Sequence, residues 1–173
     1  MSHDPMFLQD HHVVAGFYPV ADITNSGAIT SDIICMKHYE VATFFFFCGV
    51  STGGTSDGLI TVFACDDNVA TNAVVMPFDW WECVSSTTVD AWTGPTATAV
   101  GGATMTGASN QIYAAEVTAA AVLSAGLLDT PSHNADWVKV VWTEQTAHAI
   151  VGGIYCVLSH PRSADSTMPT ALA

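Results

Sequence analysis

The strongest hydrophobic pattern in the chain is Tyr39–Val50 (YEVATFFFFCGV), which contains four consecutive phenylalanines. A second apolar strand, Leu59–Cys65, follows after Ser51–Gly58, a link with three glycines and no apolar residue. Gly- and Ser-rich links of this kind are typical of hairpin loops. We therefore predict that the two segments pair as the central hairpin of a β-sandwich.

The phenylalanine run also predicts how this strand is buried. Side chains alternate between the two sides of a strand. One side would carry Val41, Thr43, Phe45 and Phe47, and the other Ala42, Phe44, Phe46 and Cys48. Because each buried Phe stabilises the fold by about 1.5–3 kcal/mol, we expect both sides to be covered by the rest of the chain, with Phe45 and Phe47 in the core.

Other apolar segments predict the remaining elements. Thr118–Leu128 is the one convincing helix, with Thr118 as N-cap and Gly126 near its end, and a loop with one helical turn is the alternative for this short segment. Pro19 favours an edge position for its strand, and Gly152-Gly153 allows a bulge or close packing. Further strands are predicted at Val13–Ile23, Ser31–Met36, Ala73–Val84, Gln111–Val117, Asp136–Thr143 and Ala147–Ser159. Ser85–Gly107 is expected to form two or three weak strands or a long exposed excursion. Roughly eight strands at this spacing predict an all-β fold, a single β-sandwich for which a jelly roll is one arrangement.

Two features refine this outline. Trp80 and Trp81 are neighbours in a predicted strand, so one should lie in the core and the other at a surface or interface. The polar ends divide the chain into an arm (1–12), a sandwich domain (13–161) and a tail (162–173). Each polar end still carries a few apolar residues, namely Met6, Phe7 and Leu8 in the arm and Met168, Pro169 and Leu172 in the tail.

Charge excludes some partners. The chain has 3 basic and 16 acidic residues, a formal net charge of −13. Such a surface is repelled by nucleic acid and by anionic lipid. Half of the residues are hydrophobic and only 11% are charged, which favours partner subunits covering part of the surface. The N-terminus lacks the pattern of a signal peptide, and the longest apolar run is too short to span a bilayer. These features favour a soluble protein.

Candidate chemistry is sparse. Gly49–Gly53 matches G-x-S-x-G, but a nucleophile elbow needs a helix directly after Ser51, and the sequence predicts another strand. The histidines lack metal-binding spacing, including those of the arm, and we expect no metal and no cofactor. The five cysteines form no CxxC motif and favour buried free thiols in a reducing cytoplasm. No pattern indicates an enzyme.

Several segments together resemble a family of small virion structural proteins of tailed bacteriophages. The likeness covers most of the chain and consists of structural signatures. Its pieces are the Met-Ser-His start, Ser31–Met36, the Tyr39–Val50 run with its Gly-rich turn, ITVFACDDNVA, Pro77–Trp81, Gln111–Leu123 and the ending VLSHPRSADSTMPTALA. Thr87–Gly107 and the loop after Asp67 depart most from it.

The resemblance implies a capsid decoration (cement) protein on the outside of a phage head, made in the bacterial cytoplasm. Its partner would be the major capsid protein, with self-association around a symmetry axis. Expected partner-binding residues are Met6, Phe7, Leu8, Trp80, Trp81, Arg162, Met168, Pro169 and Leu172. Alternatives are a neck or tail component, a carbohydrate-binding sandwich that groups Trp80, Trp81 or Trp92 on one open face, and, more weakly, a hydrolase that uses Ser51.

Overall fold

The structure, a computed structural model, describes residues 7, 11–20, 22–23, 27–51, 58–83, 91–105, 110–145 and 149–162. Within these residues it contains twelve strands and helix α2 (Ala119–Leu128). The strands are β1 (His11–Val20), β2 (Ala28–Thr30), β3 (Ile34–Cys35), β4 (Tyr39–Ser51), β5 (Gly58–Cys65), β6 (Ala73–Met76), β7 (Asp79–Cys83), β8 (Thr93–Ala97), β9 (Ala103–Met105), β10 (Gln111–Thr118), β11 (Trp137–Thr143) and β12 (Ile150–Pro161).

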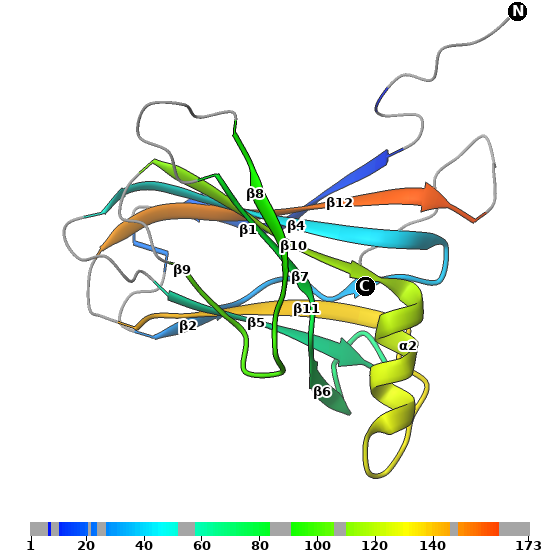
Figure 1. The fold of residues 1–173 in the computed structure, drawn as a ribbon. Helices are drawn as coiled ribbons and strands as arrows, with labels where there is room; N and C mark the ends of the chain where they lie inside the picture. The colour runs from blue at the N-terminus through cyan, green and yellow to red at the C-terminus, as the bar shows by residue number, and fades with distance from the viewer. Residues whose placement is uncertain are drawn as a thin grey trace, which may run out of the picture.

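The strands form two sheets that pack face to face (Figure 1). Sheet A has the order β1-β12-β4-β10-β7-β8. Sheet B has the order β2-β11-β5-β6, with β3 beside β11 and β9 beside β5. The predicted all-β sandwich with one short helix is therefore confirmed in the part of the chain that the structure describes.

The order of strands within the sheets is that of a jelly roll. Four antiparallel pairs are nested along the chain: β1 with β12, β2 with β11, β4 with β10, and β5 with β6. The outermost pair joins the first and last described strands. Successive pairs alternate between sheet A and sheet B, which is the double-sheet arrangement of jelly rolls. Strands β7 and β8 follow β6 in the chain and extend sheet A beyond β10.

The predicted central hairpin is wrong. Strand β4 lies in sheet A and β5 in sheet B, so they do not pair with each other. Each strand is central in its own sheet, β4 between β12 and β10 and β5 between β11 and β6. The Gly-rich link between them therefore connects one sheet to the other. Its composition alone does not show whether it connects two sheets or two paired strands.

The core lies between the inner faces of the two sheets. Phe44 and Phe46 of β4 and Tyr113 of β10 are fully buried from sheet A, and Val140 and Trp142 of β11 from sheet B. Phe46 meets Trp142 across the layers, with ring centroids 6.1 Å apart at 80°. The predicted alternation of β11 is confirmed, because Val138, Val140 and Trp142 are buried while Trp137, Lys139 and Val141 face outward.

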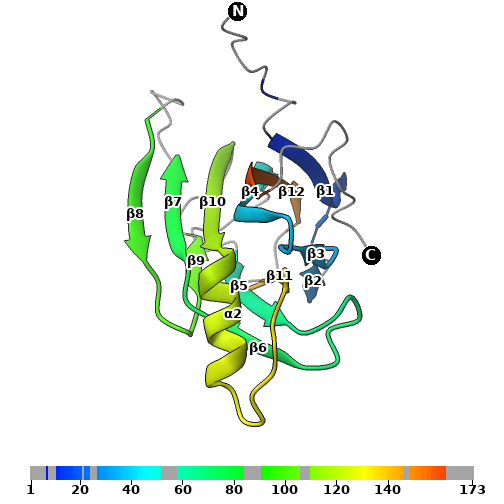
Figure 2. The same cartoon turned by 90° about the vertical axis from the view of Figure 1, so that its right-hand side faces the viewer.

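Helix α2 follows the predicted pattern. Thr118 is its N-cap, and its hydroxyl oxygen accepts a hydrogen bond from the backbone N–H of Ala121 (3.1 Å). The helix lies at one end of the sandwich, next to β5 and β6 (Figure 2). Gly126 lets the segment after the helix pass close to it, since a Cβ there would lie 2.6 Å from the carbonyl oxygen of His133.

Two predicted strands are corrected, and a third segment forms strands as predicted. Ala73–Val84 is split at Pro77 into β6 of sheet B and β7 of sheet A, because proline cannot donate to a sheet ladder. In Ser31–Met36 only Ile34–Cys35 forms a strand. Ser85–Gly107 contributes β8 and β9 among its described residues, in line with the two or three weak strands predicted.

Both edge strands of sheet A contain a proline. Strand β1 carries Pro19, which confirms its predicted edge position, and β8 carries Pro95. β1 begins at His11, two residues before the predicted start of the domain, and β12 ends at Pro161, where the domain was predicted to end. Gly152 and Gly153 serve close packing, since Cβ atoms there would lie 3.0 Å from Phe47 O and from Pro19 Cγ. The register shift between Ile150 and Gly152 places the extra residue on β4, not at the glycines.

All five cysteines are free and buried, as predicted. Burial raises the pKa of the Cys65 thiol to about 11, and it also raises the pKa of Cys156. Buried thiols with raised pKa values carry little thiolate at neutral pH, so these side chains act as small apolar core residues.

Candidate functional surface

The outer side of β4 is not covered as the sequence predicted. Phe44 and Phe46 are fully buried, but Phe45 is half-buried and 40% of Phe47 is exposed. The correction has a simple cause: sheet B covers one face of sheet A, and no described element forms a layer over the other face. The phenylalanine run therefore leaves an apolar surface on the outside of the protein.

The strand register gathers further aromatic residues beside Phe45 and Phe47. Tyr155 of β12 pairs with Phe45, Phe45 pairs with Ala114 of β10, and Ala114 pairs with Trp81 of β7. Side chains directly opposite in antiparallel strands point to the same face. We call Phe45, Phe47, Trp81, Tyr155 and Val157 the outer apolar face of sheet A.

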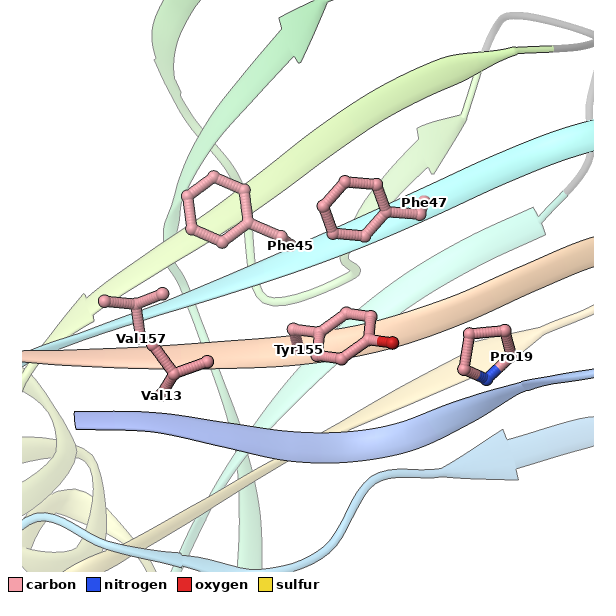
Figure 3. A pocket seen from close by; sticks show the side chains of 6 residues that line it. All are labelled: Val13, Pro19, Phe45, Phe47, Tyr155 and Val157. Carbon is pink, nitrogen blue, oxygen red and sulfur yellow. The ribbon is translucent and has the colours of Figure 1, made fainter. Parts of the chain in front are cut away.

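A shallow hollow of about 570 Å³ occupies the β1–β12–β4 side of this face (Figure 3). It is lined by Val13 and Pro19 of β1, Tyr155 and Val157 of β12, and Phe45 and Phe47 of β4. The ring of Phe47 meets that of Tyr155 edge-on, with centroids 5.6 Å apart at 84°. Apart from the Tyr155 hydroxyl the lining side chains are apolar, so the hollow suits an apolar group.

A second hollow, of about 300 Å³, lies across Phe45 on the β4–β10–β7 side. It is lined by Thr43, Phe45, Trp81, Trp92, Ala114 and Glu116. Ala114 is small, so its position between Phe45 and Trp81 leaves room above the sheet. Thr43 donates a hydrogen bond from its hydroxyl to Glu116 Oε2 (3.0 Å). We call this site the aromatic–carboxylate hollow.

The two tryptophans of β7 have opposite roles, as their alternation predicted. Trp80 is only 5% exposed, stacks on Tyr113 at 5.4 Å, and donates its indole N–H to Glu82 Oε1 (2.8 Å). The prediction that Trp80 binds a partner is therefore wrong, because its ring fills the core. Trp81 lies on the outer face, where that prediction can still apply.

The other predicted partner-binding residues are spread over the molecule. Phe7 is exposed and stacks on His11, with centroids 4.5 Å apart. Arg162 is exposed, and its backbone N–H donates to the carbonyl oxygen of His38 (2.8 Å). Met6, Leu8, Met168, Pro169 and Leu172 lie outside the described residues. Of the predicted set, only Trp81 belongs to the outer apolar face.

The sequence analysis missed Phe45, Phe47 and Tyr155 as surface residues. Their signal was present, because a run of four phenylalanines leaves two on each side of a strand. The same signal is produced by a strand buried on both faces. Trp92, named only with the carbohydrate-binding alternative, is 42% exposed and packs edge-on against Phe45 at 6.2 Å.

The other candidate sites gain no support. Strand β4 continues through Ser51, and the next described element is strand β5, so the strand-to-helix turn of a nucleophile elbow is absent from the described residues. Within the described ranges, no three His, Cys, Asp or Glu side chains are grouped so that they could hold a metal ion. No helix among these residues is long and apolar enough to cross a bilayer.

Comparisons with known proteins add no relative: no family model, no curated protein and no solved structure matches the chain. The class of protein is therefore defined by its fold and surface alone: it is a jelly-roll β-sandwich with an aromatic outer face.

Proposed function

We propose that this is a non-enzymatic virion structural protein, a decoration (cement) protein that binds the outer face of a tailed-phage head. The observation that carries the proposal is the outer apolar face of sheet A. Phe47 on this face and Trp92 beside it are each about 40% exposed, next to half-buried Phe45, Trp81 and Tyr155. Apolar surface concentrated in this way marks a protein interaction site.

Three further features support this assignment. Jelly rolls are common in virus particles, although they also occur in lectins and cupins and do not by themselves fix a function. A net charge of −13 opposes contact with packaged DNA and suits the outside of a shell. The resemblance found in the sequence implies the same role. Many copies on a symmetric shell would bind through multivalency even if each contact is modest.

A carbohydrate-binding module is the second candidate, because Trp81, Trp92, Phe45 and Tyr155 share one open face. Sugar binding also needs polar groups that hydrogen-bond hydroxyls. Thr43 and Glu116 are hydrogen-bonded to each other at this face, and the larger hollow has a single polar group, the Tyr155 hydroxyl. The balance of apolar and polar groups therefore favours a protein partner.

The first test is stoichiometry. Quantitative mass spectrometry of purified particles should find the protein in a fixed ratio to the major capsid protein, at many copies per head. A few copies per particle would instead support a neck or tail component. Complete absence from particles would refute a virion role.

The second test addresses the surface. Phe47→Thr keeps a residue that suits a strand but removes an exposed aromatic ring. We expect at least a tenfold loss of binding to heads that lack the protein, measured by co-sedimentation. Leu128→Thr is the matched control, because Leu128 is 82% exposed on α2 and lines neither hollow of sheet A. Equal binding by the two variants would show that the outer apolar face does not contact the head.

A further inference from the structure

The aromatic–carboxylate hollow combines two kinds of group that attract a cation. Phe45, Trp81 and Trp92 supply aromatic rings, and Glu116 supplies a carboxylate within the same lining. The electron-rich face of an aromatic ring attracts Lys, Arg and quaternary ammonium groups, most strongly for Trp. A carboxylate adds a charge-assisted hydrogen bond. The hollow thus has the composition of a site for a positively charged side chain.

These groups are held in place by the fold. Gly94 packs against Trp81, since a Cβ at Gly94 would lie 3.2 Å from Trp81 Cε3. Trp92 packs edge-on against Phe45, with ring planes at 71°. The Thr43 hydroxyl fixes one oxygen of Glu116. A preorganised site loses less conformational entropy when a ligand binds.

The protein's own described cations lie elsewhere. Lys37 is 3.6 Å from Asp136, and Lys139 lies 5.5 Å from the ring centroid of Phe63 on sheet B. Arg162 follows the end of β12, next to His38. These are all the basic residues of the chain, and in the described part Glu116 forms no ion pair. A cation in the hollow would therefore come from another molecule.

We propose that the aromatic–carboxylate hollow receives an arginine side chain of the protein partner. The inference rests on the proposed function, which makes sheet A the docking face, and adds the chemistry of the partner. Arginine fits better than lysine because its planar guanidinium stacks on aromatic rings while it donates to a carboxylate. The neighbouring larger hollow takes an apolar side chain. Because this protein is acidic, a partner surface with a basic residue would be favoured over other apolar surfaces.

The test uses the free protein and a small probe. N-acetyl-arginine amide is titrated at constant ionic strength while NMR follows the five tryptophan indole N–H signals, assigned through Trp→Phe variants. We expect the Trp81 and Trp92 signals to shift at probe concentrations on the order of 10 mM, as for a single weakly bound side chain. N-acetyl-citrulline amide, a neutral compound of nearly the same shape, should shift them much less.

Two variants locate the charge. Glu116→Gln removes the carboxylate charge from the aromatic–carboxylate hollow and should weaken probe binding at least threefold. Glu40→Gln removes one charge from an exposed position elsewhere on β4 and should leave binding unchanged. Equal shifts with the arginine and citrulline probes, or equal binding by the two variants, would overturn the proposal. Shifts of both indoles with maltotriose but not with arginine would also overturn it and favour glycan binding.

Head binding separates this inference from the proposed function. In the first outcome, heads bind the wild-type protein with an affinity that falls as salt is added, and they bind Glu116→Gln about five- to tenfold more weakly. The proposed function and the arginine site then both stand. If heads bind the two forms equally, the function stands and the arginine site fails. If the probe binds as expected but heads do not bind at all, the site stands and the decoration function fails.

Discussion

Neighbouring phenylalanines of β4 make different contacts although they share one backbone. Phe46 is fully buried between Trp80 and Trp142, with ring centroids about 6 Å away in each case. Phe47 contacts Phe45 and Tyr155 but keeps 40% of its surface in contact with solvent. Its contribution to stability should therefore be much smaller, and its surface is available to a partner.

We predict that Phe46→Ala lowers the free energy of unfolding by about 3–5 kcal/mol, because it leaves a cavity between the sheets. Phe47→Ala should cost about 1 kcal/mol or less, the scale of a lost cross-strand contact. Urea denaturation of both variants measures the difference. Similar losses for the two would mean that the outer face is covered in the isolated protein and is not a free surface.

At the scale of elements, helix α2 is stabilised by one N-cap hydrogen bond and by its buried side, and not by charged residues at its ends. It has no acidic residue in its first turn and no basic residue in its last, so interactions of charged side chains with the helix dipole do not stabilise it. The hydrogen bond from Ala121 N–H to the Thr118 hydroxyl is its one side-chain cap. Ala119, Val122 and Gly126 are the buried residues of the helix.

Thr118→Ala should therefore destabilise the protein by about 1 kcal/mol, the usual cost of removing an N-cap side chain. Ser124→Ala changes an exposed position inside the same helix and should be neutral or slightly stabilising, since Ala has the higher helix propensity. Thermal unfolding of both variants gives the comparison. A Thr118→Ala protein as stable as the Ser124→Ala control would show that packing alone positions α2.

Local pattern was sufficient for most elements but not for their arrangement. The clean alternation of Trp137–Thr143 and the cap at Thr118 are local signals, and both predictions are confirmed. Whether β4 pairs with β5 depends instead on the β10 and β12 partners, which come from distant parts of the chain. The outer face was missed for the same reason: alternation shows that Trp80 and Trp81 point oppositely, but only the position of sheet B shows which one is inside.

At the scale of the whole molecule, the boundary between arm and sandwich lies earlier than predicted. His11 pairs with Ser159, and His12 pairs with Leu158 in the edge ladder of sheet A. His12 Nδ1 also lies 3.0 Å from the hydroxyl oxygen of Tyr39, a buried residue. These two residues therefore belong to the sandwich rather than to the predicted arm.

Deleting residues 1–10 should leave the melting temperature unchanged, whereas deleting residues 1–12 should lower it, because the second deletion removes the His12–Tyr39 contact and two ladder positions. Under the proposed function, the shorter deletion should weaken head binding if the arm, through Met6, Phe7 and Leu8, is an anchor. Deletion of residues 163–173 provides the parallel test for the tail. Full head binding by both truncated proteins would leave the outer apolar face as the sole contact.

The prolines at the two edges of sheet A limit how copies of the protein can join. An exposed edge strand offers unpaired N–H and C=O groups to which another chain can add as a further strand. Pro19 and Pro95 each remove a donor from such a ladder. Growth of sheet A into a continuous ribbon through many molecules is therefore disfavoured at both ends. Copies can therefore accumulate at high local density without their sheets merging into fibres.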